Sequence, residues 1–247
     1  MLDSHPDWFK EALSVNKEQR RIEVEGNFIS YQHWGDETKP GMVLVHGSGS
    51  HSHWWDFIAP LLLDNFQISA IDLSGMGDSD HRDDYSPELY GKEILSVAED
   101  SGFFSVGEPI ICGHSMGGFM SAYAGLVSDK KLGGVIMVDS PIRPPTYDYS
   151  THVRSGPIRR IKTYPDRESI LERFRLTPEQ ECANEYLVRY IAEWSIKEAD
   201  NGYQWKFDDT IFDKLGFSHM QKNQAFGLDC ELGIIYGTES NMMTEEI

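Results

Sequence analysis

The stretch that decides the fold is IICGHSMGG, residues 110–118, in which a serine stands between two glycines. An apolar run precedes the serine and a small-residue helical pattern follows it, as expected where a buried strand turns sharply into a helix. Gly113, Ser115 and Gly117 match the pattern G-x-S-x-G, and the glycines leave room where the strand and the helix approach closely. We therefore predict that Ser115 is a nucleophile at the carboxyl end of a strand.

Apolar strands and helices alternate along most of the chain. Alternating polar and apolar residues over 21–25 and 27–34, separated by Glu25-Gly26-Asn27, predict a β-hairpin. After the hairpin, short apolar runs alternate with helical patterns, which predicts an α/β fold with a mostly parallel sheet flanked by helices. The predicted strands are 42–46, 66–71, 109–113, 134–138 and 232–236, and the predicted helices are 54–63, 86–101 and 116–128, with a short amphipathic helix within 1–20.

Residues 141–220 interrupt this alternation with a proline-rich start and a helical, aromatic-rich continuation. We predict a helix over 178–200, where apolar residues recur every three or four positions. The insertion is expected to form a helical cap over the carboxyl ends of the strands, where ligands bind in open α/β sheets. Residues 1–140 and 221–247 then form the core domain. The aromatic residues expected to fill the interior of the cap more than the pocket are Tyr186, Tyr190, Trp194, Trp205 and Phe207.

The composition is that of a globular, soluble protein. The 247-residue chain is 40% hydrophobic and 25% charged, and its formal net charge of −18 argues against nucleic acid or an anionic membrane as partner. The apolar runs fall far short of the roughly 20 residues of a membrane-spanning helix, and the acidic N-terminus does not resemble a signal peptide, so we expect a cytoplasmic location. Cys112, Cys182 and Cys230 are widely spaced, which argues against disulfides and zinc, and no cofactor or metal is implied.

A small, flexible loop lies in the stretch VLVHGSGSHSHWW, residues 43–55. Acyl transfer requires two backbone N–H groups that converge on the oxyanion of the tetrahedral intermediate. Met116, directly after the candidate nucleophile, is predicted to supply one donor and Ser48 the other, with Gly49 as an alternative to Ser48. The residues expected to line the pocket are Gly47, Gly49, His51 and His114, with His53 near its mouth, whereas His46 is expected to pack and hold the turn.

Three motifs in this order resemble the α/β-hydrolase superfamily: HGS at 46–48, DLSGMGDSD at 72–80, and GHSMGG at 113–118. The resemblance covers about residues 22–140 and 230–240, and is to serine hydrolases with a helical cap between strands six and seven. It implies hydrolysis of a carboxylic ester or related acyl bond in a small-molecule substrate, through a Ser–acid–His triad. Relatives with aspartate as nucleophile are dehalogenases and epoxide hydrolases, and Ser115 argues against both. Asp72 is expected to form hydrogen bonds within its own turn.

The acid of the triad has two candidates. Many members of the superfamily carry it just after the seventh strand in a G-x-x-D pattern, but this chain has Gly237-Thr238-Glu239-Ser240, with a serine in place of the aspartate and Glu239 one residue early. Other members carry the acid after the sixth strand, where this chain has Asp139. A shift of one residue on a tight turn points a side chain elsewhere, which favours Asp139 over Glu239. The competing role for Asp139 is to cap backbone N–H groups.

The base is the main departure from the superfamily pattern. Members carry the catalytic histidine after an eighth strand, which would need on the order of 30 residues beyond the end of the last predicted strand. We therefore expect the base to lie beyond residue 247 and this chain by itself to be weakly active or inactive. The positions of the other histidines do not favour any of them as a substitute base: His51, His53, His114, His152 and His219.

Two further expectations follow from the same departure. The alternative function is a non-catalytic protein that binds a small molecule in the capped pocket. Without an eighth strand, the strand at 232–236 would be an open sheet edge, through which chains could associate.

Overall fold

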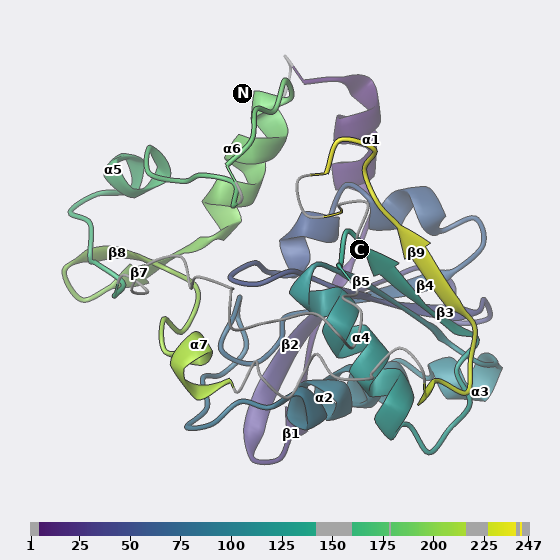
Figure 1. The fold of residues 1–247 in the computed structure, drawn as a ribbon. Coiled ribbons are helices and arrows are strands. Elements are labelled where there is room, and N and C mark those ends of the chain that lie inside the picture. Colours follow the sequence, from purple (N-terminus) through teal and green to yellow (C-terminus); the bar gives the residue numbers. More distant parts are fainter. Residues whose placement is uncertain (1–4, 142–159, 178, 216–226, 241–242, 244–247) are drawn as a thin grey trace.

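The computed structural model describes residues 5–141, 160–177, 179–215, 227–240 and 243 (Figure 1). In these residues the chain forms a seven-stranded sheet in the order β1-β2-β4-β3-β5-β6-β9 and a two-stranded sheet, β7-β8. The strands are β1 (Glu18–Val24), β2 (Asn27–Trp34), β3 (Gly41–Val45), β4 (Gln67–Ile71), β5 (Ile110–His114), β6 (Gly134–Val138), β7 (Ile196–Ala199), β8 (Gly202–Trp205) and β9 (Leu232–Ile235). The α-helices are α1 (Asp7–Ser14), α2 (Pro87–Asp100), α3 (Phe103–Val106), α4 (Met116–Val127), α5 (Arg167–Leu171), α6 (Glu185–Trp194) and α7 (Ile211–Lys214), and the 3₁₀ helices are η2 (Ser52–Trp55) and η3 (Ala59–Leu62).

The large sheet has the predicted topology. β1 and β2 form the antiparallel hairpin, closed by Glu25 and Gly26 with φ of 48° and 80°. β2 is antiparallel to β4, and β4, β3, β5, β6 and β9 are all parallel. The mostly parallel sheet is therefore confirmed.

Alternate residues of the central strands fill two cores, one on each face of the sheet. Val43, Val45 and Ile111 belong to the core on the side of α2 and α4, which lie next to each other on one face (Figure 1). Met42 and Leu44 belong to the other core. Both faces are covered, so these strands are apolar throughout and not alternating, which is what made them recognisable in the sequence.

Two of the helices predicted outside 141–220 differ in the structure. The helix expected over 54–63 is replaced by the 3₁₀ turns η2 and η3, because Pro60 has no N–H to donate and its ring would collide with a preceding carbonyl of an α-helix. The amphipathic helix expected within 1–20 is α1 alone, and β1 already begins at Glu18.

The described part of 141–220 is mixed and not purely helical. The helix predicted over 178–200 is only α6, Glu185–Trp194, and an antiparallel hairpin of β7 and β8 follows it. Asp200-Asn201 joins these strands and Gly202 begins β8, which together form a strong turn sequence, and Gly202 has a φ of 138°. The segment therefore contains a β-hairpin besides its helices, and its role as a cap over the carboxyl ends of the strands stays a prediction.

Of the aromatic residues expected to fill the interior of this segment, only Trp205 packs among residues of the segment itself, and the others pack against the rest of the described chain. Tyr186 and Tyr190 lie against Phe9 of α1, with ring centroids 5.0 and 5.7 Å apart, so α1 packs against α6, in the upper part of Figure 1. Trp205 packs against Phe174 in a second cluster.

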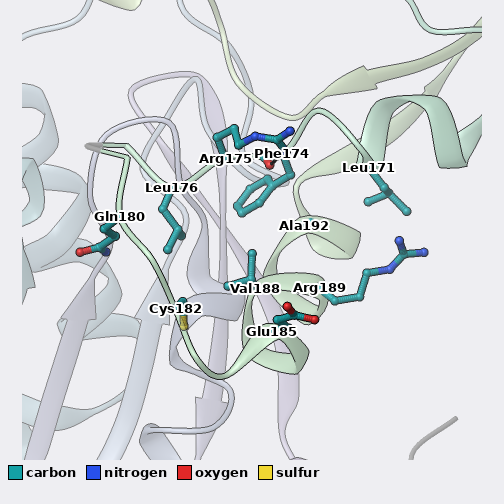
Figure 2. Close-up of a pocket in the computed structure, with 10 residues that line it drawn as sticks. All are labelled: Leu171, Phe174, Arg175, Leu176, Gln180, Cys182, Glu185, Val188, Arg189 and Ala192. Carbon is teal, nitrogen blue, oxygen red and sulfur yellow. Dashed lines mark hydrogen bonds between the residues drawn. The ribbon is translucent and has the colours of Figure 1, made fainter.

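A cleft of about 360 Å³ lies in this segment between α6 and the chain that follows α5 (Figure 2). Leu176, Cys182 and Val188 line it together with two arginines, Arg175 and Arg189. None of its lining residues comes from the loops that follow β3, β5 or β6.

β9 is the last strand of the described sheet, and its end is open to solvent. The side chains of Ile234, Ile235 and Tyr236 are 46%, 56% and 57% exposed. Association of chains through this edge stays a prediction. Among the described residues, no helix has both the length and the apolar character to cross a membrane.

Candidate active site

Ser115 lies at the junction of β5 and α4 in a strained backbone conformation. Its φ and ψ are 52° and −120°, in a region that non-glycine residues rarely occupy. The Ser115 amide donates to the carbonyl of Val138 at 2.9 Å, and the Ser115 carbonyl accepts from the amide of Gly118 at 3.0 Å. The side chain is half-buried, and its hydroxyl forms no hydrogen bond to any described residue.

Two glycines make this sharp turn sterically feasible. A Cβ on Gly117 would lie 2.6 Å from the carbonyl oxygen of Val45 and closer still to that of His46. A Cβ on Gly113 would collide with the carbonyl of Gly117. Strand, turn and helix are therefore in backbone contact, which is the reason given above for the glycines of the motif.

The loop after β3 approaches Ser115 through Gly47. A Cβ added to Gly47 would lie 3.5 Å from Cβ of Ser115 and 3.1 Å from Nδ1 of His114. Burial lowers the pKa of the His114 imidazole, and the charge of Asp139 partly opposes this shift. The structure thus brings Gly47, His114 and Asp139 to the same end of the sheet as Ser115.

The two predicted oxyanion donors, Met116 and Ser48, belong to the two segments that meet at Ser115: α4 and the loop after β3. Met116 is the buried first residue of α4, and Ser48 is an exposed residue of the loop after β3. Among the described residues, the amides of Ser48 and Met116 donate to no acceptor. The amide of Gly49, the alternative donor, is directed instead to Sδ of Met76 at 3.2 Å.

His46 and Asp72 hold the loops of the site, as expected. His46 Nδ1 lies 2.7 Å from the carbonyl oxygen of Gly47, and the amide of Leu73 donates to His46 Nε2 at 3.1 Å. These contacts place the proton on Nδ1, and burial lowers the pKa of His46. The Asp72 carboxylate accepts from the amides of Ser52 at 2.5 Å and Asp78 at 2.9 Å.

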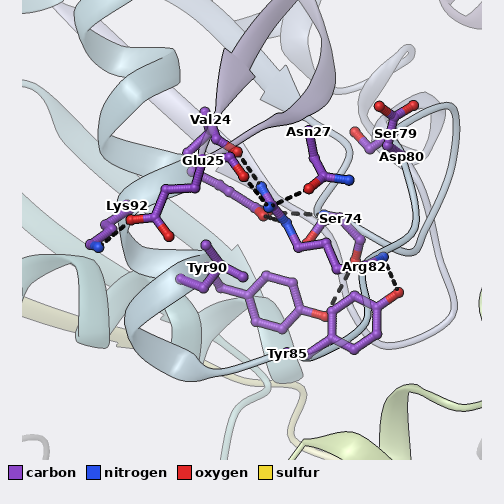
Figure 3. A network of polar contacts seen from close by, with 12 residues as sticks. Val24, Glu25, Asn27, Ser74, Ser79, Asp80, Arg82, Tyr85, Tyr90 and Lys92 are labelled. Carbon is purple, nitrogen blue, oxygen red and sulfur yellow. Dashed lines mark hydrogen bonds and ion pairs between the residues drawn. The ribbon is translucent and has the colours of Figure 1, made fainter.

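A buried ion pair supports the loop after β4, and Figure 3 shows its arginine, Arg82, near Ser74 of that loop. Arg82 Nε donates to Glu93 Oε1 at 3.0 Å, and the other oxygen of Glu93 accepts from the amide of Ser74 at 2.9 Å. Met76 follows two residues later and reaches the amide of Gly49. Glu93 therefore helps to position the loop after β4, which contacts the loop after β3 through Met76, although sequence reasoning did not single Glu93 out.

His51 and His53 face the segment between β6 and β9. His51 is 2% exposed, and its Nε2 lies 2.9 Å from the hydroxyl of Ser195. Burial lowers the pKa of His51 well below its usual value. The ring of His53 stacks on that of Trp194 with centroids 3.6 Å apart. Both imidazoles are thus held at the boundary with α6.

Asp139 follows β6 and, like Ser115, has a positive φ. Its φ is 47°, and its amide donates to the carbonyl of Ile235 at 2.7 Å. The hydroxyl of Ser240 donates to Asp139 Oδ2 at 2.9 Å. Oδ1 is shielded from solvent and accepts no hydrogen bond from the described part of the chain.

The other candidate acid, Glu239, is exposed and makes no ion pair or hydrogen bond within the described residues. Sequence reasoning recognised Ser240 only as a missing aspartate and not as a partner of Asp139. The signal that could have revealed the contact is that both residues follow the carboxyl ends of neighbouring parallel strands. His152 and His219 lie outside the described residues.

The geometry agrees with the comparisons to known proteins. A sequence profile of the alpha/beta hydrolase family matches residues 42–214, more than half of the chain. The chain is 29% identical over 140 residues to the uncharacterized hydrolase YugF of Bacillus subtilis, a match that covers 54% of this chain and 50% of that protein. It is 26% identical over 206 residues to a serine hydrolase-like protein of Danio rerio, covering 77% of this chain and 62% of the relative. The chain thus spans about half to three fifths of these curated relatives.

Solved structures extend the likeness to the fold. The thioesterase domain from the curacin biosynthetic pathway superposes with a TM-score of 0.71 at 20% identity, covering 94% of this chain and 86% of that domain. At this level of identity the likeness shows the fold alone. The fold, the profile match and the strained serine between β5 and α4 lead to one conclusion: the chain belongs to the alpha/beta hydrolase family.

Proposed function

We propose that this protein is a serine hydrolase that cleaves a carboxylic ester or related acyl bond through an acyl-enzyme on Ser115. The observation that carries the proposal is the backbone of Ser115, whose φ of 52° and ψ of −120° present a half-buried hydroxyl between β5 and α4. Such strain persists where the surrounding structure enforces it, and it concentrates at functional sites. Attack by the hydroxyl oxygen on a substrate carbonyl would form a tetrahedral intermediate with a negatively charged oxygen.

The amides of Met116 and Ser48 are the proposed donors to that oxygen. Both amides are uncommitted within the described residues, whereas the Gly49 amide already donates to Met76. This difference favours Ser48 over Gly49 as the second donor. Met116 is also the first residue of the twelve-residue helix α4, whose N-terminal dipole favours negative charge at this point.

Asp139 is the proposed acid. A triad carboxylate accepts a hydrogen bond from the imidazole and fixes its tautomer. Asp139 has a buried oxygen with no described donor, while Glu239 is exposed. The histidine expected beyond residue 247 stays a prediction. The hydrolase names of the relatives agree with this reaction class.

Labelling with a fluorophosphonate probe tests the proposal. The probe should modify the chain at Ser115, identified by peptide mass spectrometry, and Ser115→Ala should remove the label. Ser121→Ala is a matched control, because Ser121 lies on α4 and its hydroxyl donates to the carbonyl of Gly117 at 2.7 Å. A chain that binds small acyl compounds but is never labelled, also with added imidazole as base, would instead be the non-catalytic binding protein.

A further inference from the structure

We propose that Ser240 is a positioning residue for Asp139: its hydroxyl holds one carboxylate oxygen so that the other is presented to an imidazole N–H. The inference rests on the proposed function and deepens it. It assigns a role to a serine at the position where the sequence pattern led us to look for an acid.

The contact joins two residues that are far apart in sequence. Asp139 and Ser240 follow β6 and β9, which pair in parallel with Val138 opposite Ile235. The Asp139 amide extends this pairing by donating to the carbonyl of Ile235 at 2.7 Å. The Ser240 amide donates to the carbonyl of Gly237 at 3.0 Å, which closes a tight turn and brings the hydroxyl to Asp139 Oδ2 at 2.9 Å.

The two carboxylate oxygens of Asp139 have different surroundings. Oδ2 accepts the hydrogen of Ser240, whereas Oδ1 is shielded from solvent without a donor from the described residues. A buried acceptor without a donor is unfavourable, and so is the φ of 47° at the same residue. Two unfavourable features in one residue indicate that its geometry serves a function. Since rotation of the carboxylate would break the bond to Ser240, that bond fixes the direction of Oδ1.

The chemistry of residue 240 fits this task. A carboxylate at this position would lie beside that of Asp139, and two like charges in contact cannot both stay ionised without a large cost. The hydroxyl of Ser240 donates a hydrogen bond and adds no second negative charge. Asp139 is then the only carboxylate of this pair of positions and can be the partner of an imidazole. A serine after β9 is thus compatible with a triad acid, Asp139, that follows the neighbouring strand β6.

The experiment measures the rate of fluorophosphonate labelling of Ser115 with and without free imidazole. In the step measured, the oxygen of Ser115 forms a bond to phosphorus, fluoride leaves, and the proton passes to the imidazole. We expect imidazole to accelerate labelling of the wild-type chain and of Ser240→Thr, which keeps the hydroxyl. Ser240→Ala should label at least about tenfold more slowly in imidazole, the value of one hydrogen bond to a charged group.

Controls separate the possible failures. Thr238→Ala removes an exposed hydroxyl from the same turn and should label at the wild-type rate, and circular dichroism checks that each variant is folded. Equal labelling of wild type and Ser240→Ala, with and without imidazole, would refute the role of Ser240 while keeping Ser115 as nucleophile. The role of Ser240 would also be refuted if imidazole did not change the labelling rate of the wild-type chain and Ser240→Ala did not lower that rate. Absence of any label at Ser115 would refute the proposed function and, with it, this inference.

Discussion

Among single residues, Gly117 shows that the site depends on close backbone contacts, which leave no space for an added Cβ atom. A Cβ on Gly117 would meet the carbonyls of Val45 and His46, which cannot move without disturbing β3. We expect Gly117→Ala to lower the free energy of unfolding by roughly 1–3 kcal/mol, the usual cost of overpacking, and to abolish labelling at Ser115. Urea unfolding measures the first effect. Gly107→Ala is the matched control, because a Cβ there would meet nothing within 4 Å, and an equal loss in both variants would contradict the argument.

The choice between the two acids is also made at single residues. Asp139→Asn replaces one carboxylate oxygen by an NH2 group and removes the charge, so we expect it to lower the rate of ester hydrolysis by two orders of magnitude or more, as for a triad acid. Glu239→Gln removes an exposed charge and should change the rate by less than about threefold. The measurement is hydrolysis of p-nitrophenyl acetate in the presence of imidazole. A larger loss in Glu239→Gln would reverse the assignment.

At the scale of elements, Asp208 joins the short helix α7 to the loop after β4. Its carboxylate accepts from the hydroxyl of Tyr85 at 2.7 Å and from the hydroxyl and amide of Thr210 at 2.6 and 2.8 Å. Its own amide donates to the carbonyl of Gly75 at 2.7 Å. Burial by itself would raise the pKa of Asp208, but the donors from Thr210 and Tyr85 outweigh it and lower the pKa from 3.8 to about 2.

This shift predicts a specific pH dependence. The native state holds the Asp208 carboxylate in its charged form more strongly than the unfolded chain does, so its stabilisation is complete above pH 4 and is lost as the pH falls towards 2. Asp208→Asn should therefore cost about 2 kcal/mol near neutral pH, and the difference from wild type should shrink between pH 4 and pH 2. Asp213→Asn on α7 is the control, because its ion pair with Arg160 is exposed and is worth less than about 1 kcal/mol. A constant difference across this range would contradict the argument.

The secondary-structure elements differ in how well the sequence predicts them. The strands and the turn at Ser115 were predictable because their pattern is local: an apolar run, two glycines and a helix start. The hairpin of β7 and β8 was missed because the helix predicted from the apolar spacing of α6 was continued to residue 200, through the residues that form β7. The bond between Asp139 and Ser240 was not predictable, because it depends on which strand ends become neighbours.

At the scale of the whole molecule, Asp56 connects the core to the segment that lies between β6 and β9. Its Oδ2 is contacted by three donors: His53 Nδ1 at 2.7 Å, Lys17 Nζ at 2.6 Å and the hydroxyl of Tyr190 at 2.5 Å. Burial by itself would raise the pKa of Asp56, but His53 and Lys17 outweigh it, so the pKa lies below its usual value. The carboxylate is thus charged at neutral pH and holds α6 through Tyr190.

If this contact positions α6, removing one hydroxyl should loosen that helix while the sheet is unaffected. We expect Tyr190→Phe to lower the free energy of unfolding by about 1.5–3 kcal/mol, the value of a hydrogen bond to a charged group. Amide hydrogen exchange should accelerate over 185–194 more than over 110–127. Tyr186→Phe is the matched control on the same helix, since the Tyr186 ring packs on Phe9 and its hydroxyl has no hydrogen-bond partner among the described residues. Equal exchange over both stretches would mean that α6 is held by the apolar contacts with α1 and not by Asp56.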